Sequence, residues 1–315
     1  MQNSDMQQRV FTRREICRMA AAGTLFGWGT RALGDGNKRP FSLNYILASS
    51  MYGTIRLEEI LPQVAKTGAA CIDIWPRGHA DQREQIEAMG HDRFAELLKK
   101  NNVRLGMSTC YNLGPFRLQD EMRFVKKFDG KLLICGSAGP RNPVGAECKR
   151  AVKQFVEKMK PHTAAAEELG LTIGIENHAN ALINTPDSLR YLADLADSPG
   201  LGIALAPYHL PQDPKLIAEL IEHLGPKLVH FYAWQHGKGC HKKLPKQQEL
   251  EQMPGRGSMD FGPLLAALKK IGYSRWTEIF MHPVPRGIPI LDTTAQVTEE
   301  INRARRYLDG LVKRS

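Results

Sequence analysis

The sequence alternates strand-like and helix-like segments eight times, and this alternation restricts the fold more than any other feature of the chain. Each strand-like segment is a short apolar run, followed by a segment with helical character. The expected strands cover residues 42–49, 70–75, 103–109, 131–137, 171–177, 201–206, 227–233 and 275–281. The expected helices cover residues 56–67, 83–101, 117–128, 144–169, 187–196, 214–224, 260–271 and 293–312. Strict alternation of this kind predicts an α/β fold in which parallel strands close into a single-domain (β/α)8 TIM barrel.

Several expected helix boundaries carry residues that favour them. Pro186 and Pro214 stand near helix starts, and Gly170 and Gly272 follow the last turn of a helix. A doubly wound open sheet is the alternative architecture, but no Gly-x-Gly-x-x-Gly motif follows the first strand. Residues 236–259 form a Gly-, Lys- and Pro-rich excursion after the seventh strand. In a barrel this loop would lie over the mouth, as a lid or a substrate-contacting loop.

Residues 1–39 do not continue the pattern and instead resemble an export signal. Arg13 and Arg14 precede a short apolar run at 19–28, and small and polar residues follow it. Paired arginines before a short apolar run resemble a twin-arginine signal. We therefore expect a signal peptide and linker over 1–39, a barrel over 40–315 and a periplasmic location. The alternative is an N-terminal extension of a cytoplasmic enzyme.

The charge of the chain raises the question of a nucleic-acid partner. The net charge is +10 and the pI is about 9.3. The positive residues are scattered and form no stripe interleaved with aromatic residues, so we expect no nucleic-acid binding. The net charge would instead help to attract an anionic small substrate. No apolar run reaches the roughly eighteen residues of a membrane-spanning helix, so we expect no membrane insertion of the mature protein. The sequence leaves the oligomeric state open, a homo-oligomer included.

Carboxylate and imidazole side chains gather at the ends of four consecutive expected strands. Glu176 ends the fifth strand, His209 follows the sixth, and His230 and Glu278 lie in the seventh and eighth. A parallel barrel brings these strand ends together at one face. Mixed carboxylate and imidazole ligands suit Mn²⁺, Zn²⁺, Co²⁺ or Fe²⁺ better than Ca²⁺. Taken singly, each His has a core or rim position as its alternative, and each Glu an ion pair. Their joint placement favours a site.

Five fragments of the chain have the order and spacing of one known superfamily. They are Gly68–Ile74 with its acidic residue Asp73, Ile175–Asn177, Leu228–His230, Pro254–Phe261 and Trp276–Glu278. Together they resemble the xylose-isomerase-like superfamily, in its sugar phosphate isomerase/epimerase branch. The resemblance covers roughly residues 42–312, which is essentially the whole expected barrel.

The resemblance implies a divalent metal ion held by Glu176, His230 and Glu278. One position departs from the family's pattern, because its sixth strand commonly ends Asp-x-x-His where this chain has Ala206 and His209. Alanine cannot bind a metal, so His209 or water would complete the shell, or the metal would be weak or absent. With a metal, the implied activity is that of a sugar isomerase or epimerase. Glu176 and Glu278 would face opposite sides of the substrate and move a proton through an enediolate.

Other residues near the strand ends are expected to contact a small-molecule sugar substrate. Aromatic side chains could wall the sugar ring, with plain barrel packing as the alternative. Arg286 could grip a phosphate, a carboxylate or hydroxyls, with a structural pair to loop carbonyls as the alternative. The expected substrate-binding residues are Asp73, Trp75, His178, Tyr208, Trp234, His236, His282 and Arg286.

Three other functions remain to be weighed against an isomerase. A keto-sugar dehydratase or lyase shares the first proton abstraction and differs in what leaves. A carbohydrate-binding barrel without metal or catalysis is favoured by Ala206 and opposed by the four retained polar residues at the strand ends. A three-zinc apurinic endonuclease of the same superfamily is disfavoured, because the chain has no Asp-x-His pair. An exported enzyme would meet free or oxidised sugars more readily than sugar phosphates.

Overall fold

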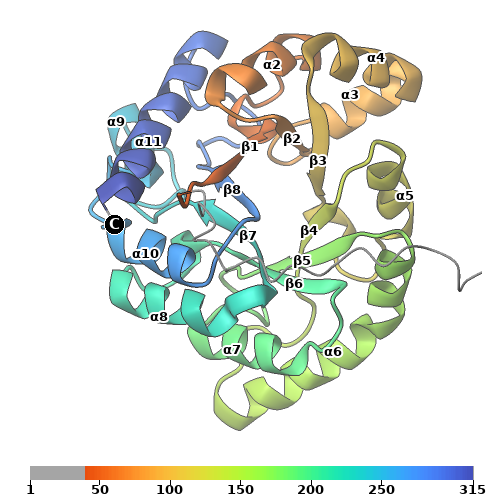
Figure 1. The fold of residues 1–315 in the computed structure, drawn as a ribbon, viewed down its shortest axis with the longest axis vertical. Helices are drawn as coiled ribbons and strands as arrows, with labels where there is room; N and C mark the ends of the chain where they lie inside the picture. The colour runs from red at the N-terminus through yellow and green to blue at the C-terminus, as the bar shows by residue number, and fades with distance from the viewer. Residues whose placement is uncertain (1–39, 315) are drawn as a thin grey trace, which may run out of the picture. The chain divides into compact units, whose positions relative to one another are not determined.

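Eight parallel strands form a closed barrel in sequence order in the computed structural model, which describes residues 40–314 (Figure 1). This confirms the predicted TIM barrel. The expected signal segment, 1–39, lies outside the described residues. The strands are β1 (Asn44–Ala48), β2 (Cys71–Ile74), β3 (Arg104–Thr109), β4 (Leu132–Gly136), β5 (Thr172–Glu176), β6 (Leu201–Leu205), β7 (Leu228–Ala233) and β8 (Trp276–Ile279).

Helices surround the barrel on its outside, as Figure 1 shows. They are α2 (Leu57–Val64), α3 (Gln82–Met89), α4 (His91–Asn101), α5 (Gln119–Lys127), α6 (Gly145–Glu168), α7 (Pro186–Leu195), α8 (Pro214–Leu224), α9 (Lys246–Glu249), α10 (Gly262–Lys270) and α11 (Thr294–Arg314). The prediction of a single helix over 83–101 was wrong, because Gly90 takes a φ of 82° and separates α3 from α4. The excursion over 236–259 also contains the short helix α9, which was not predicted.

Pro186 and Pro214 begin helices as predicted, and the residue before each proline caps its helix. The Thr185 side chain accepts a hydrogen bond from the Ser188 backbone before α7, and Asp213 accepts from two backbone N–H groups before α8. Each cap satisfies N–H groups that the helix itself leaves without a partner, and a proline occupies the first helical position.

Within the described residues, no helix combines the length and apolarity that a bilayer crossing needs.

Large side chains pack inside the barrel where glycines stand opposite them. A Cβ on Gly106 would lie 2.5 Å from Ile46 Cδ1 and 3.3 Å from the Trp276 ring, so only glycine leaves room for both. A Cβ on Gly174 would lie 2.6 Å from Ile134 Cδ1. These contacts fill the interior of the barrel in the middle of β3 and β5.

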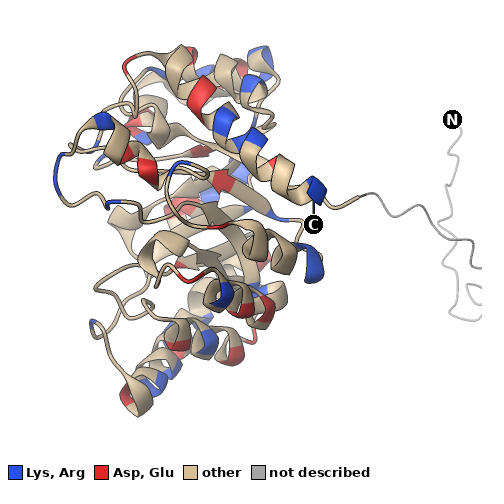
Figure 2. Cartoon of the chain, turned by 90° about the vertical axis from the view of Figure 1, so that its left-hand side faces the viewer, with Lys and Arg blue, Asp and Glu red and all other residues tan. Residues whose placement is uncertain are grey.

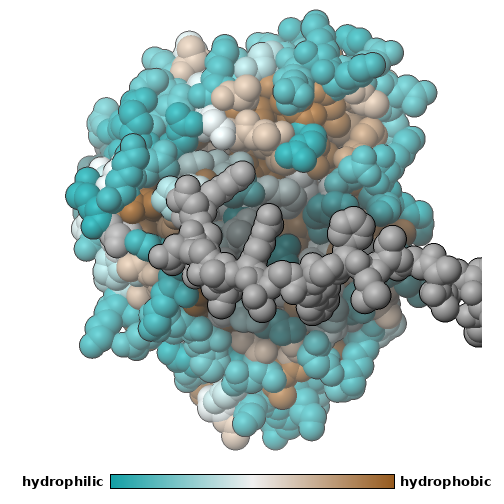
Figure 3. All heavy atoms as spheres, in the orientation of Figure 1, coloured by the Kyte–Doolittle hydropathy of each residue, from teal (hydrophilic) through white to brown (hydrophobic). Residues whose placement is uncertain are grey.

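The outer surface of the described chain carries charge without a single basic face. Figure 2 shows Lys and Arg spread over the outer helices and loops, with Asp and Glu between them. Hydrophilic residues cover most of the face shown in Figure 3. Among the described residues, the large hydrophobic side chains that are exposed are Val144 and Ile288. Most large apolar side chains are therefore buried in the barrel and in the layer of helices around it.

Candidate functional site

Two adjoining cavities open at the carboxyl ends of the strands, where the sequence places its candidate residues. Their volumes are about 280 and 240 Å³. Both are lined by His178, His209, His282 and Arg286. The first also touches Trp75, His79, Tyr111, Glu176 and Phe280, and the second Tyr208, Trp234, Cys240 and His241. Active sites of TIM barrels lie at this end of the strands, so the cavities together form the candidate site.

Glu176 and His209 form a close pair at the floor of this site. Glu176 is the last residue of β5 and is 3% exposed, and His209 ends the short 3-10 turn that follows β6. Glu176 Oε1 lies 3.6 Å from His209 Nε2. Asn177 fixes the start of the turn, because its side chain donates to the Ala206 carbonyl at 3.0 Å and accepts from the Ala206 N–H at 2.8 Å. The end of β5 and the turn after β6 therefore fix the positions of Glu176 and His209 relative to each other.

Burial sets the protonation of this pair. It raises the pKa of Glu176 well above its usual range, and the charge of Asp73 raises it further. Burial lowers the pKa of His209 to about 2, assisted by the neighbouring His178. His209 is therefore a neutral imidazole at ordinary pH, and Glu176 keeps its proton to a higher pH than a solvated carboxyl. A carboxyl with a raised pKa beside a neutral imidazole suits proton transfer.

A second layer of polar side chains lies deeper in the barrel and lines neither cavity. His230 on β7 and Glu278 on β8 are fully buried, and His230 Nε2 lies 3.1 Å from Glu278 Oε2. Asp73 is also fully buried and accepts a hydrogen bond from Thr109 Oγ1 at 2.7 Å. Burial raises the pKa of Glu278, as does the charge of Asp73, and burial lowers the pKa of His230 to about 3. Glu278 lines neither cavity in this structure, and the expectation that it faces a substrate across from Glu176 stays a prediction.

The donor groups of the site do not fit a metal centre as they are arranged. Buried atoms of His230 and Glu278 lack hydrogen-bond partners, so unmet bonding capacity exists in the deeper layer. However, Glu176–His209 and His230–Glu278 remain separate pairs, and no three His, Cys, Asp or Glu side chains in residues 40–314 are grouped so that they could hold a metal ion. Ala206, where the resemblance would place an Asp ligand, is fully buried. The predicted four-residue metal shell therefore has no preformed counterpart here.

The rim of the cavities is lined by imidazoles and one guanidinium. The rings of His178 and His209 lie 4.1 Å apart, and those of His79 and His282 lie 4.3 Å apart. The Arg286 guanidinium is hydrogen-bonded to His79 Nε2. Burial lowers the pKa of all four imidazoles, to about 3 for His79. The rim is therefore rich in neutral hydrogen-bonding groups and carries the positive charge of Arg286.

Aromatic side chains form the walls, as the sequence suggested, and they are also tightly packed. Trp75 stacks on Phe280 with ring centroids 5.1 Å apart, and Tyr208 stacks on Trp234 at 3.9 Å. Trp75 and Trp234 are only 1% and 2% exposed, so each serves both as cavity lining and as core packing. Of the expected substrate-binding residues, Asp73 and His236 line neither cavity, and His236 instead packs against Tyr208.

Some residues of the site were missed in the sequence. His79, Tyr111 and His241 line the cavities, and each lies outside a strand, in a loop or a short turn. Strand periodicity cannot indicate such residues. The available signal was their position in the segments that follow β2, β3 and β7, since those segments meet at the carboxyl end of the barrel.

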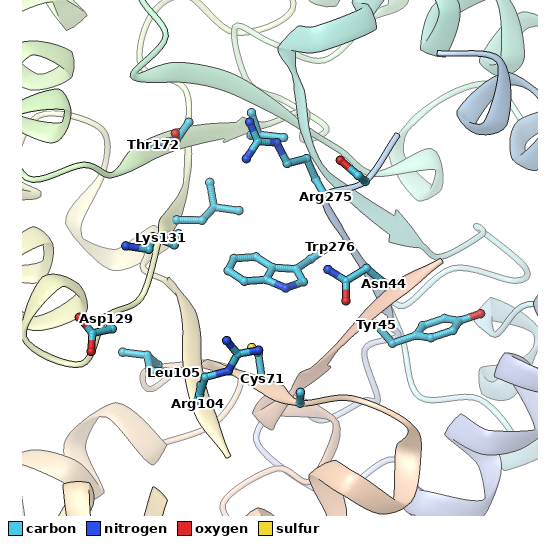
Figure 4. Close-up of a pocket in the computed structure, with 14 residues that line it drawn as sticks. Asn44, Tyr45, Cys71, Arg104, Leu105, Asp129, Lys131, Thr172, Arg275 and Trp276 are labelled. Atoms are coloured by element: carbon cyan, nitrogen blue, oxygen red, sulfur yellow. The ribbon is translucent and has the colours of Figure 1, made fainter. Parts of the chain in front are cut away.

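A larger cavity of about 630 Å³ lies at the opposite, amino-terminal end of the barrel (Figure 4). Arg104, Lys131 and Arg275 surround the indole of Trp276 there. Its lining contains no His or Glu, and Asp129 is its acidic residue. The chemistry that the sequence singled out is therefore at the other end of the strands.

Comparison with known proteins agrees with this architecture. The sequence profile described as the xylose isomerase-like TIM barrel matches residues 61–307. No curated protein sequence is significantly similar to the chain.

Solved structures with the same fold share little sequence with this chain. The IolI protein with a bound zinc atom is 16% identical with a TM-score of 0.65, over 86% of this chain and 99% of that one. The D-psicose 3-epimerase from Clostridium cellulolyticum H10, solved with D-tagatose, is 16% identical with a TM-score of 0.64, over 86% and 99%. The probable 3-DHS dehydratase AsbF from Bacillus anthracis is 13% identical with a TM-score of 0.60, over 84% and 98%. At these identities the likeness shows the fold.

Proposed function

The chain belongs to the xylose isomerase-like TIM barrel family, and we propose that it is a sugar isomerase in which Glu176 moves a proton between neighbouring carbons of the substrate. One observation carries this proposal. Within the described residues, Glu176 is the only acidic side chain that lines the two cavities at the carboxyl end of the barrel. It is also buried beside a neutral imidazole, and burial raises its pKa, which makes its carboxylate a stronger base than a solvated one.

The proposed reaction uses groups that line the cavity. The Glu176 carboxylate removes the proton from the carbon next to the substrate carbonyl, and the electron pair of that C–H bond passes to the carbonyl oxygen as an enediolate forms. A neutral imidazole N–H, from His209, donates its proton to that oxygen, as a neutral histidine does in triosephosphate isomerase. His209 then takes up the proton of the neighbouring hydroxyl, whose oxygen becomes the new carbonyl, while Glu176 returns its proton to the former carbonyl carbon. No group from the deeper layer takes part.

The position of Glu278 favours an isomerase over an epimerase. Inverting a carbon requires a second acid–base group on the other face of the substrate, and Glu278 is fully buried and lines neither cavity. Moving a proton between neighbouring carbons on one face requires a single base. The epimerase named among the structural neighbours supports carbohydrate as the substrate class. The zinc-bound neighbour makes a divalent metal the natural alternative, but the side chains of this site do not form a metal shell, so no step here depends on one.

A substrate screen with a matched pair of variants tests the proposal. Purified protein would be incubated with aldoses, ketoses and their acids, and the products identified by NMR and mass spectrometry. We expect interconversion of an aldose and a ketose by the wild type, its loss in Glu176→Gln, and wild-type turnover in Glu168→Gln on the exposed side of α6. A product that has lost water would identify a lyase, as the dehydratase among the neighbours suggests. Sugar binding without turnover would identify a carbohydrate-binding barrel.

A further inference from the structure

Arg286 is the cation that lines the candidate site. It lies in the loop after β8 and borders both cavities. Its hydrogen-bonding side-chain partner is His79, and in residues 40–314 it forms no ion pair with an Asp or a Glu. Its side chain is exposed, so its charge is open to solvent and to any ligand that enters the cavities.

Nitrogen-bearing side chains outnumber acids around Arg286. The two cavities are lined by Arg286 together with His79, His178, His209, His241 and His282. Among the described residues Glu176 is the one acid in that lining. A cavity with a guanidinium and many imidazole nitrogens favours a ligand that carries a negative charge.

The backbone just after Arg286 is anchored before any ligand arrives. The Gly287 carbonyl accepts from the Thr54 N–H at 3.1 Å, and the Ile290 N–H donates to the Met51 carbonyl at 3.1 Å. Tyr52 and Pro289 also form an antiparallel bridge between the same two segments. These ties restrict the backbone of the loop, so less entropy is lost when Arg286 pairs with a carboxylate or a phosphate.

We propose that the substrate of this site carries an anionic group, a carboxylate or a phosphate, which pairs with Arg286 while the sugar carbonyl lies against Glu176 and His209. That the anionic ligand is a substrate rests on the proposed function. That an anionic sugar binds at Arg286 does not depend on it. Such a preference would separate this chain from its structural neighbour solved with D-tagatose, which is an uncharged sugar.

Isothermal titration calorimetry at low ionic strength, in a buffer free of phosphate, tests the binding part directly. The members of each ligand pair differ only at carbon 6, which carries either an anionic group or a neutral hydroxymethyl group: D-glucuronate against D-glucose, D-galacturonate against D-galactose, and D-glucose 6-phosphate against D-glucose. We expect at least one anionic member to bind about tenfold or more tightly than its neutral partner. The carboxylate and phosphate arms distinguish the two sources of negative charge.

Four variants show whether the binding depends on Arg286. Arg286→Gln should abolish the preference for the anionic ligand and Arg286→Lys should keep part of it, because lysine retains charge without the planar fork. The control is Arg77→Gln, an exposed arginine in the loop after β2 that lines neither cavity, and it should behave as the wild type. Glu176→Gln should still bind the anion, which keeps binding apart from catalysis.

Each outcome decides one of the two claims. Equal affinity for charged and neutral sugars, or an anion preference that survives Arg286→Gln, would overturn the inference. Turnover of a neutral sugar that is unchanged in Arg286→Gln would overturn it while leaving the proposed function intact. Arg286-dependent binding of an anionic sugar without turnover would support the inference and count against the proposed function.

Discussion

Glu176 and Glu278 show how position along a strand decides what a carboxyl can do. Both lie on strands, both are buried, and burial raises the pKa of each. Glu176 ends its strand and lines the cavity, whereas in the β8 region the cavity is lined by Phe280 and His282, which follow the end of the strand, and not by Glu278. The residue that meets the cavity can exchange a proton with a substrate. The other must keep its proton or share it with His230 inside the barrel.

The raised pKa of Glu176 predicts the pH dependence of the reaction. As a general base, Glu176 acts only when it is ionised, so kcat/KM should increase with pH through its folded-state pKa and fall below it. Because that pKa lies well above the usual range, the acidic limb should be centred well above the roughly 4.3 of a solvated glutamate. The measurement is kcat/KM against pH for wild type. A limb near the ordinary carboxyl value would contradict the assigned environment.

At the residue scale the sequence predicted the end of the barrel at which the site lies, but not its depth. A period of two places Glu278, Phe280 and His282 on one face, and all three do turn inward. Periodicity cannot say which layer meets the cavity, because that depends on how far the large side chains fill the barrel from below. His79 was missed for a different reason, since it lies in a loop where no periodicity applies.

The loop between β8 and α11 is the element on which the anion site depends. It is tied to the segment that follows β1, and Gly53 lies at the closest approach. Gly53 has a φ of +57°, and a Cβ there would lie 2.3 Å from the Ile288 carbonyl carbon. Those contacts are to backbone, so they cannot be relieved by rotating a side chain.

Substituting Gly53 should therefore displace the loop as well as strain the backbone. Gly53→Ala should destabilise the protein by more than the roughly 1 kcal/mol of an ordinary left-handed glycine and should weaken ligand binding at Arg286. The matched control is Gly272→Ala, since Gly272 has a φ of +64° and nothing within 4 Å of its Cβ position. Urea unfolding and calorimetric binding of both variants are the measurements. Equal effects at the two positions would rule out a specific role for the Gly53 contact.

Helix α11 is joined to the loop before α10 by a three-residue ion network. Glu300 accepts from Arg256 Nε at 2.7 Å and from Arg303 Nε at 2.8 Å. These arginines lower the pKa of Glu300 although burial alone would raise it. A carboxyl with a lowered folded-state pKa stabilises the fold above its unfolded pKa, and this stability is lost as pH falls through the folded value.

Replacing Glu300 should remove that part of the acid sensitivity. Glu300→Gln should lower the free energy of unfolding at pH 7 by about 1–2 kcal/mol, and the difference from wild type should shrink as the pH falls below about 4. Urea titrations of both proteins from neutral to acidic pH measure this. A difference that stays constant over the whole range would mean that the charge of Glu300 does not contribute.

Element positions were largely predictable because the strands of a parallel barrel are buried on both faces and read as apolar runs. The break between α3 and α4 was not, because a single glycine within an amphipathic stretch is often tolerated inside a helix. Here Gly90 takes a backbone conformation outside the helical region, and the packing of the two short helices on the barrel decides the outcome.

At the scale of the whole molecule, the described chain combines a family barrel with a departure from the family's implied metal shell. The closed barrel and the profile match over residues 61–307 place it in the xylose isomerase-like family. The sixth strand supplies no side-chain ligand, and the remaining acids and imidazoles form pairs. The expected twin-arginine signal and periplasmic location remain predictions.

Metal addition should consequently have little effect on stability. A ligand that binds only the native state raises the free energy of unfolding. The increase grows with the ratio of ligand concentration to Kd and is about 2.7 kcal/mol when that ratio is a hundred. We expect the Tm of chelator-treated wild type to stay unchanged when Mn²⁺, Zn²⁺, Co²⁺ or Fe²⁺ is added. A rise of several degrees that is absent in Glu176→Gln would show that the two pairs rearrange into a metal centre.

The most direct test of proton transfer by Glu176 is solvent-deuterium exchange followed by NMR, with chelator-treated protein and the sugar panel in heavy water. The account predicts that the wild type places deuterium on a carbon next to the carbonyl of one sugar, and that Glu176→Gln does not. Exchange that persists undiminished in Glu176→Gln, exchange that requires an added metal, or no exchange with any sugar would contradict it.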